Sequence, residues 1–88
     1  MRKLNPKTAK QLQKLLFEWK RQSDRYDKAK RNLKRVKQGG KAWYKWGEEL
    51  ESAKQRLWEI NQLIQLVGFK SYSDARNYLK RHGYLVPK

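Results

Sequence analysis

The segment from Lys28 to Lys45 has a composition suited to contacting phosphate groups. It contains eight lysines and arginines and no acidic residue. Some of these cations stand four apart, as Lys30 and Lys34 do, and such a like-charge pair destabilises an isolated helix by about 0.2–0.5 kcal/mol. Phosphates bound between the side chains would remove this repulsion and release condensed counterions. We therefore expect a nucleic-acid-binding surface formed by Lys28, Lys30, Arg31, Lys34, Arg35, Lys37, Lys41 and Lys45, and extended by Lys20, Arg21 and Arg25.

Three aromatic residues, Trp43, Tyr44 and Trp46, lie at the end of this basic segment. A base stacked on such a ring contributes about 1–3 kcal/mol to binding. Trp43 and Trp46 fall on the apolar side of a predicted helix, so we expect them to pack against its partner. Tyr44 lies off that side and is the better candidate for stacking. Whether the tryptophans also contact bases stays open at this point.

The excess positive charge is concentrated in the first part of the chain. The 88 residues include 23 Lys and Arg against 8 Asp and Glu, for a net charge of +15. Residues 1–38 hold 14 basic and 3 acidic residues, a net +11, whereas residues 39–67 hold four of each. An ordinary solubilising surface mixes the two signs more evenly, so this asymmetry favours an anionic partner.

The sequence has little that could perform catalysis or bind a metal. It contains no Cys and a single His, His82, so thiolate metal sites and Cys–His catalytic pairs are excluded. Glu48, Glu49 and Glu51 lie in the early turns of a predicted helix, where negative charge is favourable. The glycine pair 39–40 follows a long helix instead of opening one after a strand, so it does not predict a phosphate-binding loop. We expect a non-enzymatic protein with no cofactor and no metal.

Two heptad repeats predict the elements that carry the basic segment. Asn5 and Pro6 form a helix start, because Asn can cap free amides and Pro is favoured at the first helical position. Residues that are apolar, or that can be accepted at an apolar position of the repeat, then recur in steps of three and four up to residue 38, and again over residues 41–67. The first series is Leu12, Leu15, Trp19, Gln22, Tyr26, Ala29, Leu33 and Val36, and the second is Trp43, Trp46, Leu50, Ala53, Leu57, Ile60, Ile64 and Val67.

The glycines between the two repeats predict that the helices fold back on each other. Further apolar residues widen the two repeats near the chain termini, namely Leu16, Phe17, Trp58, Leu63 and Leu66. A short helix that Ser71 or Ser73 could cap would cover them, using Phe69, Tyr72, Ala75, Tyr78, Leu79, Tyr84 and Leu85. We expect an all-α single domain over residues 1–88: a long antiparallel, coiled-coil-like helical hairpin with a short C-terminal third helix packed at its base. The expected helices are about 6–38, 41–67 and 73–82, with a turn at 39–40.

These observations predict a binding protein that presents a basic helical arm to the phosphate backbone of RNA or DNA, mostly independent of sequence. The main alternative is a small adaptor or inhibitor of the phage or plasmid type, which docks on an acidic protein surface or on a nucleic-acid-processing enzyme. A helix-turn-helix motif in which Arg76, Asn77, Lys80 and Arg81 contact bases in the major groove fits less well, because Asp74 would fall at a buried position. No stretch is apolar enough to span a membrane, so we expect an intracellular, cytoplasmic protein. The oligomeric state is open.

Overall fold

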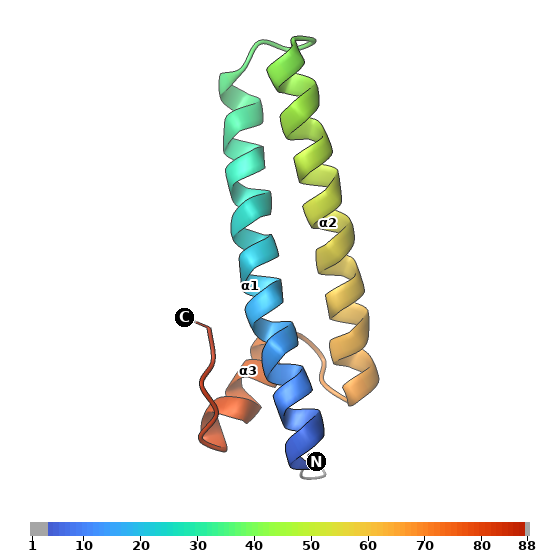
Figure 1. Ribbon diagram of the computed structural model, residues 1–88, viewed down its shortest axis with the longest axis vertical. Helices are drawn as coiled ribbons and strands as arrows, with labels where there is room; N and C mark the ends of the chain where they lie inside the picture. Colours follow the sequence, from blue (N-terminus) through green and yellow to red (C-terminus); the bar gives the residue numbers. More distant parts are fainter. Residues whose placement is uncertain (1–3, 88) are drawn as a thin grey trace.

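The computed structural model describes residues 4–87 and is all-helical over that range. Helix α1 runs from Pro6 to Arg35, α2 from Lys41 to Val67 and α3 from Tyr72 to Arg81. Figure 1 shows α1 and α2 side by side along the long axis and running in opposite directions, with α3 near the N-terminal end of α1. The molecule is elongated, about 50 × 22 × 18 Å. The predicted all-α hairpin with a third helix at its base is therefore confirmed.

Helix α1 begins where the sequence predicts and ends earlier. The Asn5 side chain accepts a hydrogen bond from the Thr8 amide at 2.8 Å, and Pro6 occupies the first turn. The expectation that the helix continues to residue 38 is wrong, because Val36 already has extended backbone angles. The amide of Gly40 donates to the Lys37 carbonyl at 3.2 Å, and Gly39 between them has φ +85°. Residues 37–40 thus form a four-residue turn whose third residue, Gly39, has a positive φ. Because Lys37 is the first residue of this turn, α1 must end before it.

The two helices pack tightly only through small residues in the part of the hairpin near the turn, which we call the arm (residues 20–53). Ala29 and Ala53 are fully buried there. The other predicted contact positions of the arm, including Leu33, Trp43 and Trp46, are half-buried. A two-helix ribbon has no third element to cover the flanks of its large side chains, so these keep partial exposure.

The base of the molecule, where three elements meet, holds the hydrophobic core. Its largest fully buried side chains are Leu12, Leu16, Ile60, Ile64 and Leu79. Phe69 and Ala75, from the segment after α2 and from α3, complete this core. The tail therefore closes the open end of the hairpin, as the sequence predicts.

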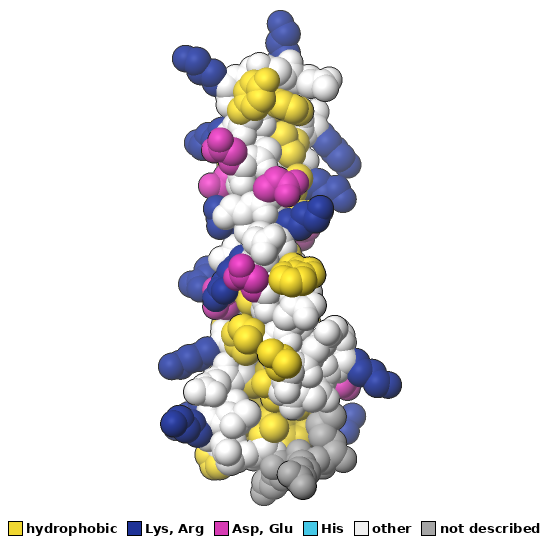
Figure 2. Space-filling model, turned by 90° about the vertical axis from the view of Figure 1, so that its right-hand side faces the viewer, with side chains coloured by type: hydrophobic (Ala, Val, Ile, Leu, Met, Phe, Trp, Pro, Cys, Tyr) yellow, Lys and Arg dark blue, Asp and Glu magenta, His cyan; other side chains and the backbone are white. Residues whose placement is uncertain are grey.

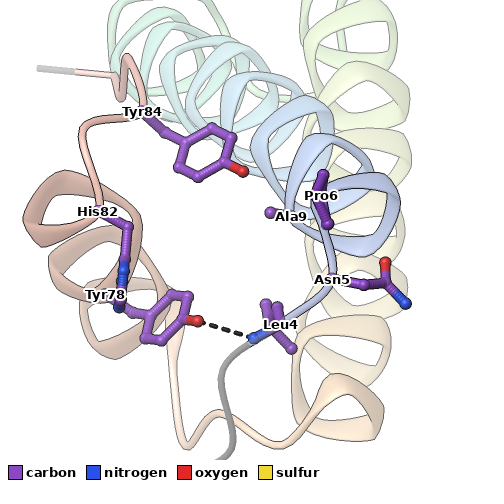
Figure 3. A pocket seen from close by; sticks show the side chains of 7 residues that line it. All are labelled: Leu4, Asn5, Pro6, Ala9, Tyr78, His82 and Tyr84. Atoms are coloured by element: carbon purple, nitrogen blue, oxygen red, sulfur yellow. Dashed lines mark hydrogen bonds between the residues drawn. The ribbon is translucent and has the colours of Figure 1, made fainter.

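Local signals place α3 against α1. Gly68 ends α2 with φ +115°, a conformation that favours glycine, and the Ser71 hydroxyl caps α3 by accepting from the Asp74 amide at 3.4 Å. Trp19 and Tyr72 stack with ring centroids 3.9 Å apart. At the other end of α3, the Tyr78 hydroxyl accepts a hydrogen bond from the Leu4 amide at 2.8 Å (Figure 3).

Five apolar residues that we expected to join this core are exposed, and that expectation is wrong for each of them. They are Phe17, Trp58, Leu63, Leu66 and Leu85. For Trp58, Leu63 and Leu66 the physical reason is the position of α3, which packs mainly against α1 and leaves the outer face of α2 uncovered. Phe17 lies on α1 in a hollow that is lined by residues of α1 alone. In the tail, the neighbouring Val86 packs on the core in place of Leu85.

Candidate nucleic-acid interface

The basic residues at the end of the arm are exposed. Four of them, Lys30, Arg31, Lys34 and Arg35, lie on the last turns of α1, and Lys37 lies in the connecting turn. Within residues 4–87, no carboxylate comes within ion-pair distance of any of the eight cations between residues 28 and 45. We call this acid-free end of the hairpin the tip. It is formed by Lys28, Lys30, Arg31, Lys34, Arg35, Lys37, Lys41 and Lys45.

Acidic residues border the tip on the side nearer the base. Asp24 and Asp27 line a shallow hollow on α1 together with Lys30, Arg31 and Lys34. Asp27 precedes Arg31 by four residues and Lys34 by seven, so the three share one side of the helix. The positive field is therefore least compensated from Lys34 onward, toward the turn.

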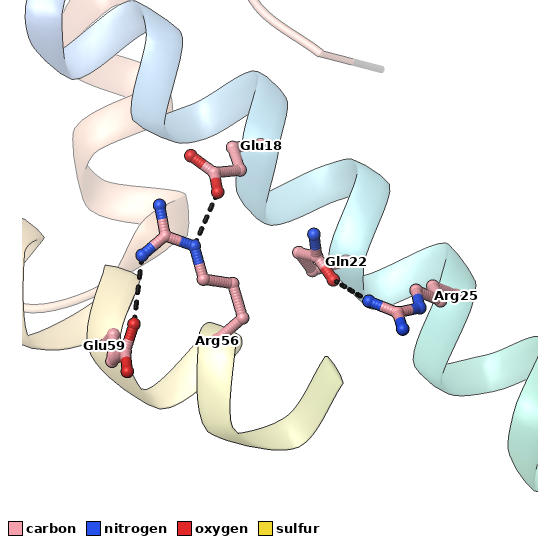
Figure 4. Close-up of polar contacts among 5 residues, drawn as sticks. All are labelled: Glu18, Gln22, Arg25, Arg56 and Glu59. Atoms are coloured by element: carbon pink, nitrogen blue, oxygen red, sulfur yellow. Dashed lines mark hydrogen bonds and ion pairs between the residues drawn. The ribbon is translucent and has the colours of Figure 1, made fainter. Parts of the chain in front are cut away.

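Arg25 has a different environment from the cations of the tip. Its Nε donates to Oε2 of Glu49 on α2 at 2.6 Å. Its Nη1 donates to Oε1 of Gln22 at 3.3 Å (Figure 4). The hydrogen bond from Arg25 lowers the pKa of Glu49, and the same bond raises the pKa of Arg25. Arg25 thus links the two helices, and its guanidinium is less available to a phosphate than the lysines above it.

The two other predicted residues below the tip also have acidic neighbours. Lys20 forms an ion pair with Asp24 at 3.3 Å, one helical turn away. Arg21 is exposed and lines a hollow with Glu18. Of the predicted residues, Lys20 and Arg25 therefore have an ion-pair partner, whereas Arg21 and the eight cations of the tip have none within residues 4–87.

A second link between the helices lies closer to the base. Arg56 on α2 donates through Nε to Glu18 on α1 at 2.5 Å and through Nη1 to Glu59 at 3.0 Å (Figure 4). The hydrogen bond from Arg56 lowers the pKa of Glu18. Sequence reasoning missed this group. The three-residue spacing of Arg56 and Glu59 indicates that they can pair within α2. Contact between Glu18 of α1 and Arg56 of α2 depends on the register of the two helices.

The aromatic residues of the tip are held among its lysines. The Lys45 and Lys28 ammonium groups lie 5.5 and 6.0 Å from the centroid of the Trp46 ring, within cation–π range. Trp43 meets Tyr44 edge to face, with centroids 5.0 Å apart. Trp43 and Trp46 are half-buried, whereas Tyr44 is 61% exposed. Among these three rings, Tyr44 presents the most surface for stacking.

Other parts of the described structure offer less chemistry. A pocket of about 500 Å³ at the base is lined by Leu4, Ala9, Tyr78, His82 and Tyr84 together with Asn5 and Pro6 (Figure 3). Residues 4–87 bring no three metal-ligating side chains together. None of the helices in this range is long and apolar enough to cross a membrane.

Comparison of the chain with protein-family models, curated proteins and solved structures gives no match. The function must therefore be argued from the residues of this chain. The feature that stands out is the cluster of exposed cations at the tip, none of which has an ion-pair partner within residues 4–87.

Proposed function

We propose that this protein binds the phosphate backbone of RNA or DNA through the tip, without catalysing a reaction. The observation that carries the proposal is the cluster of eight exposed cations with no carboxylate in ion-pair distance among the described residues. Such a cluster repels itself, and the repulsion is relieved when phosphates bind and condensed counterions leave. A surface that served only solubility would gain nothing from keeping its cations apart from carboxylates.

The shape of the arm suits a polymer better than a small anion. The exposed cations of the tip extend along α1 from Lys28 to Arg35, which is about 10 Å at 1.5 Å per residue. Duplex DNA carries one phosphate charge per about 1.7 Å of its axis, so a rod of this length passes several phosphates. Most of the tip cations are lysines, whose compact ammonium groups contact phosphates as point charges. This composition supports binding that is mostly independent of sequence.

Tyr44 adds a way to distinguish unpaired from paired nucleic acid. Its exposed ring lies beside Lys45 and Lys41, within the positive field that would hold a backbone. A base that is free to leave its stack can cover such a ring, whereas a paired base cannot. We therefore expect a modest preference for ligands with loops, ends or single strands.

The experiment that tests the proposal is a binding titration of the purified protein. The ligands are labelled duplex DNA, duplex RNA, a structured RNA hairpin and single strands, each at several salt concentrations. If four to six phosphates are neutralised, the logarithm of the binding constant falls with the logarithm of salt with a slope of about −3 to −5. The rank order of the ligands identifies the preferred polymer.

A charge reversal at the tip makes the titration specific to the proposed surface. We expect the double change Lys34→Glu with Arg35→Glu to weaken binding while leaving the helical content and the unfolding transition near those of the wild type. The matched control is Lys80→Glu with Arg81→Glu, because this pair also occupies the last turn of a helix and also lowers the net charge to +11. The control variant should retain most of the affinity.

Weak binding of the wild type to every ligand at physiological salt would contradict the proposal. The tip would then be assigned to an acidic protein surface, as in the adaptor or inhibitor alternative. Capture of a protein partner by the wild type, and its loss with the tip variant, would establish that alternative.

A further inference from the structure

The cations of the tip lie on both broad sides of the two-helix hairpin. Each residue of a helix is turned by about 100° from the one before it, so residues two apart point to nearly opposite sides. Lys28 and Lys30 on α1 are related in this way, and Lys34 lines the same hollow as Lys30. Figure 2 looks onto the α2 edge of the hairpin and shows Lys and Arg side chains to the left and to the right in its upper part, where the tip lies. The positive charge therefore does not form a single face.

Trp46 and two lysines form one of these sides. The ammonium groups of Lys45 on α2 and Lys28 on α1 lie 5.5 and 6.0 Å from the centroid of the Trp46 ring, so both helices place a cation at the same ring. The ring is half-buried, and the two lysines lie over it, so little of it is free to stack on a base. We call Lys28, Lys45 and Trp46 the Trp46 side. Its positive charge suits a duplex, because a duplex exposes its phosphates and keeps its bases stacked inside.

Tyr44 and the lysines of the hollow on α1 form the other side. Tyr44 precedes Trp46 by two residues and therefore points to the other side of α2, where its ring is 61% exposed. Lys30 and Lys34 lie on this side of α1, and Asp27 lines their hollow. We call Lys30, Lys34 and Tyr44 the Tyr44 side. An exposed ring beside cations is the combination that holds a single strand, whose unpaired bases stack on the ring while its phosphates contact the cations.

We propose that the tip recognises a junction between paired and unpaired nucleic acid, with the duplex on the Trp46 side and the unpaired strand on the Tyr44 side. This inference rests on the proposed binding of nucleic acid by the tip, and it names the class of ligand. Between its two sides the arm is one helix thick, about 10–12 Å with its side chains. A strand that leaves a duplex can therefore pass over the end of the hairpin, so that one ligand contacts both sides.

The turn at the end of the hairpin connects the two sides. Lys37 in the turn and Lys41 at the start of α2 are exposed, so the strand also meets positive charge between the two sides. A ligand bound on one side holds its other part close to the second side, and the two contacts together give a higher affinity than either alone. A blunt duplex and an isolated single strand each lack one of the two matching parts.

Titrations with three DNA probes and their RNA counterparts test the proposal. The probes are a blunt duplex, a single strand, and a duplex with a single-stranded overhang, all with the same total number of nucleotides and therefore a similar charge. We expect the overhang probe to bind about tenfold or more tightly than either of the others. An overhang probe that binds no more tightly than the better of the other two would overturn the junction while leaving nucleic-acid binding intact. Absence of binding to all probes would instead contradict the proposed function itself.

Two matched variants assign the two sides. Lys28→Gln with Lys45→Gln changes the Trp46 side, and Lys30→Gln with Lys34→Gln changes the Tyr44 side, and each removes two positive charges from exposed residues. The first variant should lower the salt slope by about 2 on the blunt duplex and less on the single strand, and the second should show the reverse. Equal losses by both variants on both probes would show an effect of net charge alone and would overturn the assignment of the sides.

A change of the exposed ring tests how the unpaired strand is held. Tyr44→Leu should weaken binding of the overhang probe by about fivefold or more, the loss of one stacked base, and should leave the blunt duplex almost unchanged. Tyr44→Phe keeps the ring and should retain the affinity for the overhang probe. Equal losses for the leucine and phenylalanine variants would contradict stacking on the Tyr44 side.

Discussion

The base and the tip are built from the same two helices and have different interiors. At the base, Leu12, Leu16, Ile60 and Ile64 are fully buried under α3 and the segment before it. Toward the tip, only Ala29 and Ala53 are fully buried, and the larger side chains keep partial exposure. Each large apolar side chain that is fully buried contributes about 1.5–3 kcal/mol. Most of the stability must therefore come from the base.

This difference explains how the tip can hold an unfavourable charge pattern. Its like charges lower the stability of the helix ends, while the base, about 30 Å of helix away from Arg35 at 1.5 Å per residue, keeps the chain folded. Substitutions at the base should unfold the protein, and substitutions at the tip should change binding. The following predictions test this division in order of their expected effect on the free energy of unfolding.

The largest effect is expected for Leu16→Ala at the base. Removing a fully buried leucine costs the transfer free energy of the lost atoms and leaves a cavity, for a destabilisation of about 2–5 kcal/mol. The half-buried Leu33 of the arm is the comparison, and Leu33→Ala should cost clearly less. Urea unfolding of both variants measures the difference. An equal or larger cost for Leu33→Ala would contradict the concentration of stability at the base.

Replacing either of two glycines near the tip by alanine should change the free energy of unfolding, with opposite signs for the two positions. Gly39 has φ +85°, so Gly39→Ala should destabilise the protein by about 1–2 kcal/mol. Gly47 lies inside α2 with open space at the position of a Cβ, so Gly47→Ala should stabilise it by about 0.5–1 kcal/mol. Thermal unfolding separates the two signs. Stabilisation by Gly39→Ala would contradict the turn conformation.

A smaller and pH-dependent effect is expected for Arg56→Gln, which breaks the link to Glu18. The ion pair is partly exposed, so its loss should cost about 0.2–1 kcal/mol near neutral pH. Arg56 lowers the pKa of Glu18 from its ordinary value of 4.5, so this contribution is present above that pH. It is lost as the pH falls further and Glu18 binds a proton. Unfolding measured from pH 7 to pH 3 should show the two proteins converging below about pH 4.5, and a constant difference would contradict the link.

The smallest effect on stability is expected for Tyr44→Leu, since the ring is largely exposed. The same change should weaken binding of single strands or loops by about 1–3 kcal/mol and leave duplex binding almost unchanged. Phe17→Leu is a matched control, because Phe17 is also an exposed aromatic residue and lies on α1 away from the tip. Parallel titrations of the three proteins measure the difference. Equal losses on duplex and single strand would contradict a stacking role for Tyr44.

The sequence predicted the path of the chain well because its signals were local. The cap at Asn5, the break at the glycines and the cap at Ser71 all act within a few residues. The early end of α1 at Arg35 was missed because it depends on the four residues that the turn requires. The exposure of Trp58 and Leu66 was missed because hydrophobicity alone does not reveal which helix α3 covers.

The candidate site could be predicted only as a set of residue types. Lys34 and Arg35 are exposed and have no ion pair within the described part of the chain, as their acid-free surroundings suggested. Arg25 looked equivalent in the sequence, but the fold brings Glu49 against it. A contact between two helices depends on their register to within one turn, and the heptad pattern does not define it that closely.

The most direct test of the central claim compares salt dependence at the two ends of the molecule. The wild type, the tip variant Lys34→Glu with Arg35→Glu, and the base variant Lys80→Glu with Arg81→Glu are titrated with the polymer that the wild type prefers. We predict that the slope of the logarithm of affinity against the logarithm of salt becomes shallower by about 2 in the tip variant alone. Equal slopes and affinities for the wild type and the tip variant would contradict the account.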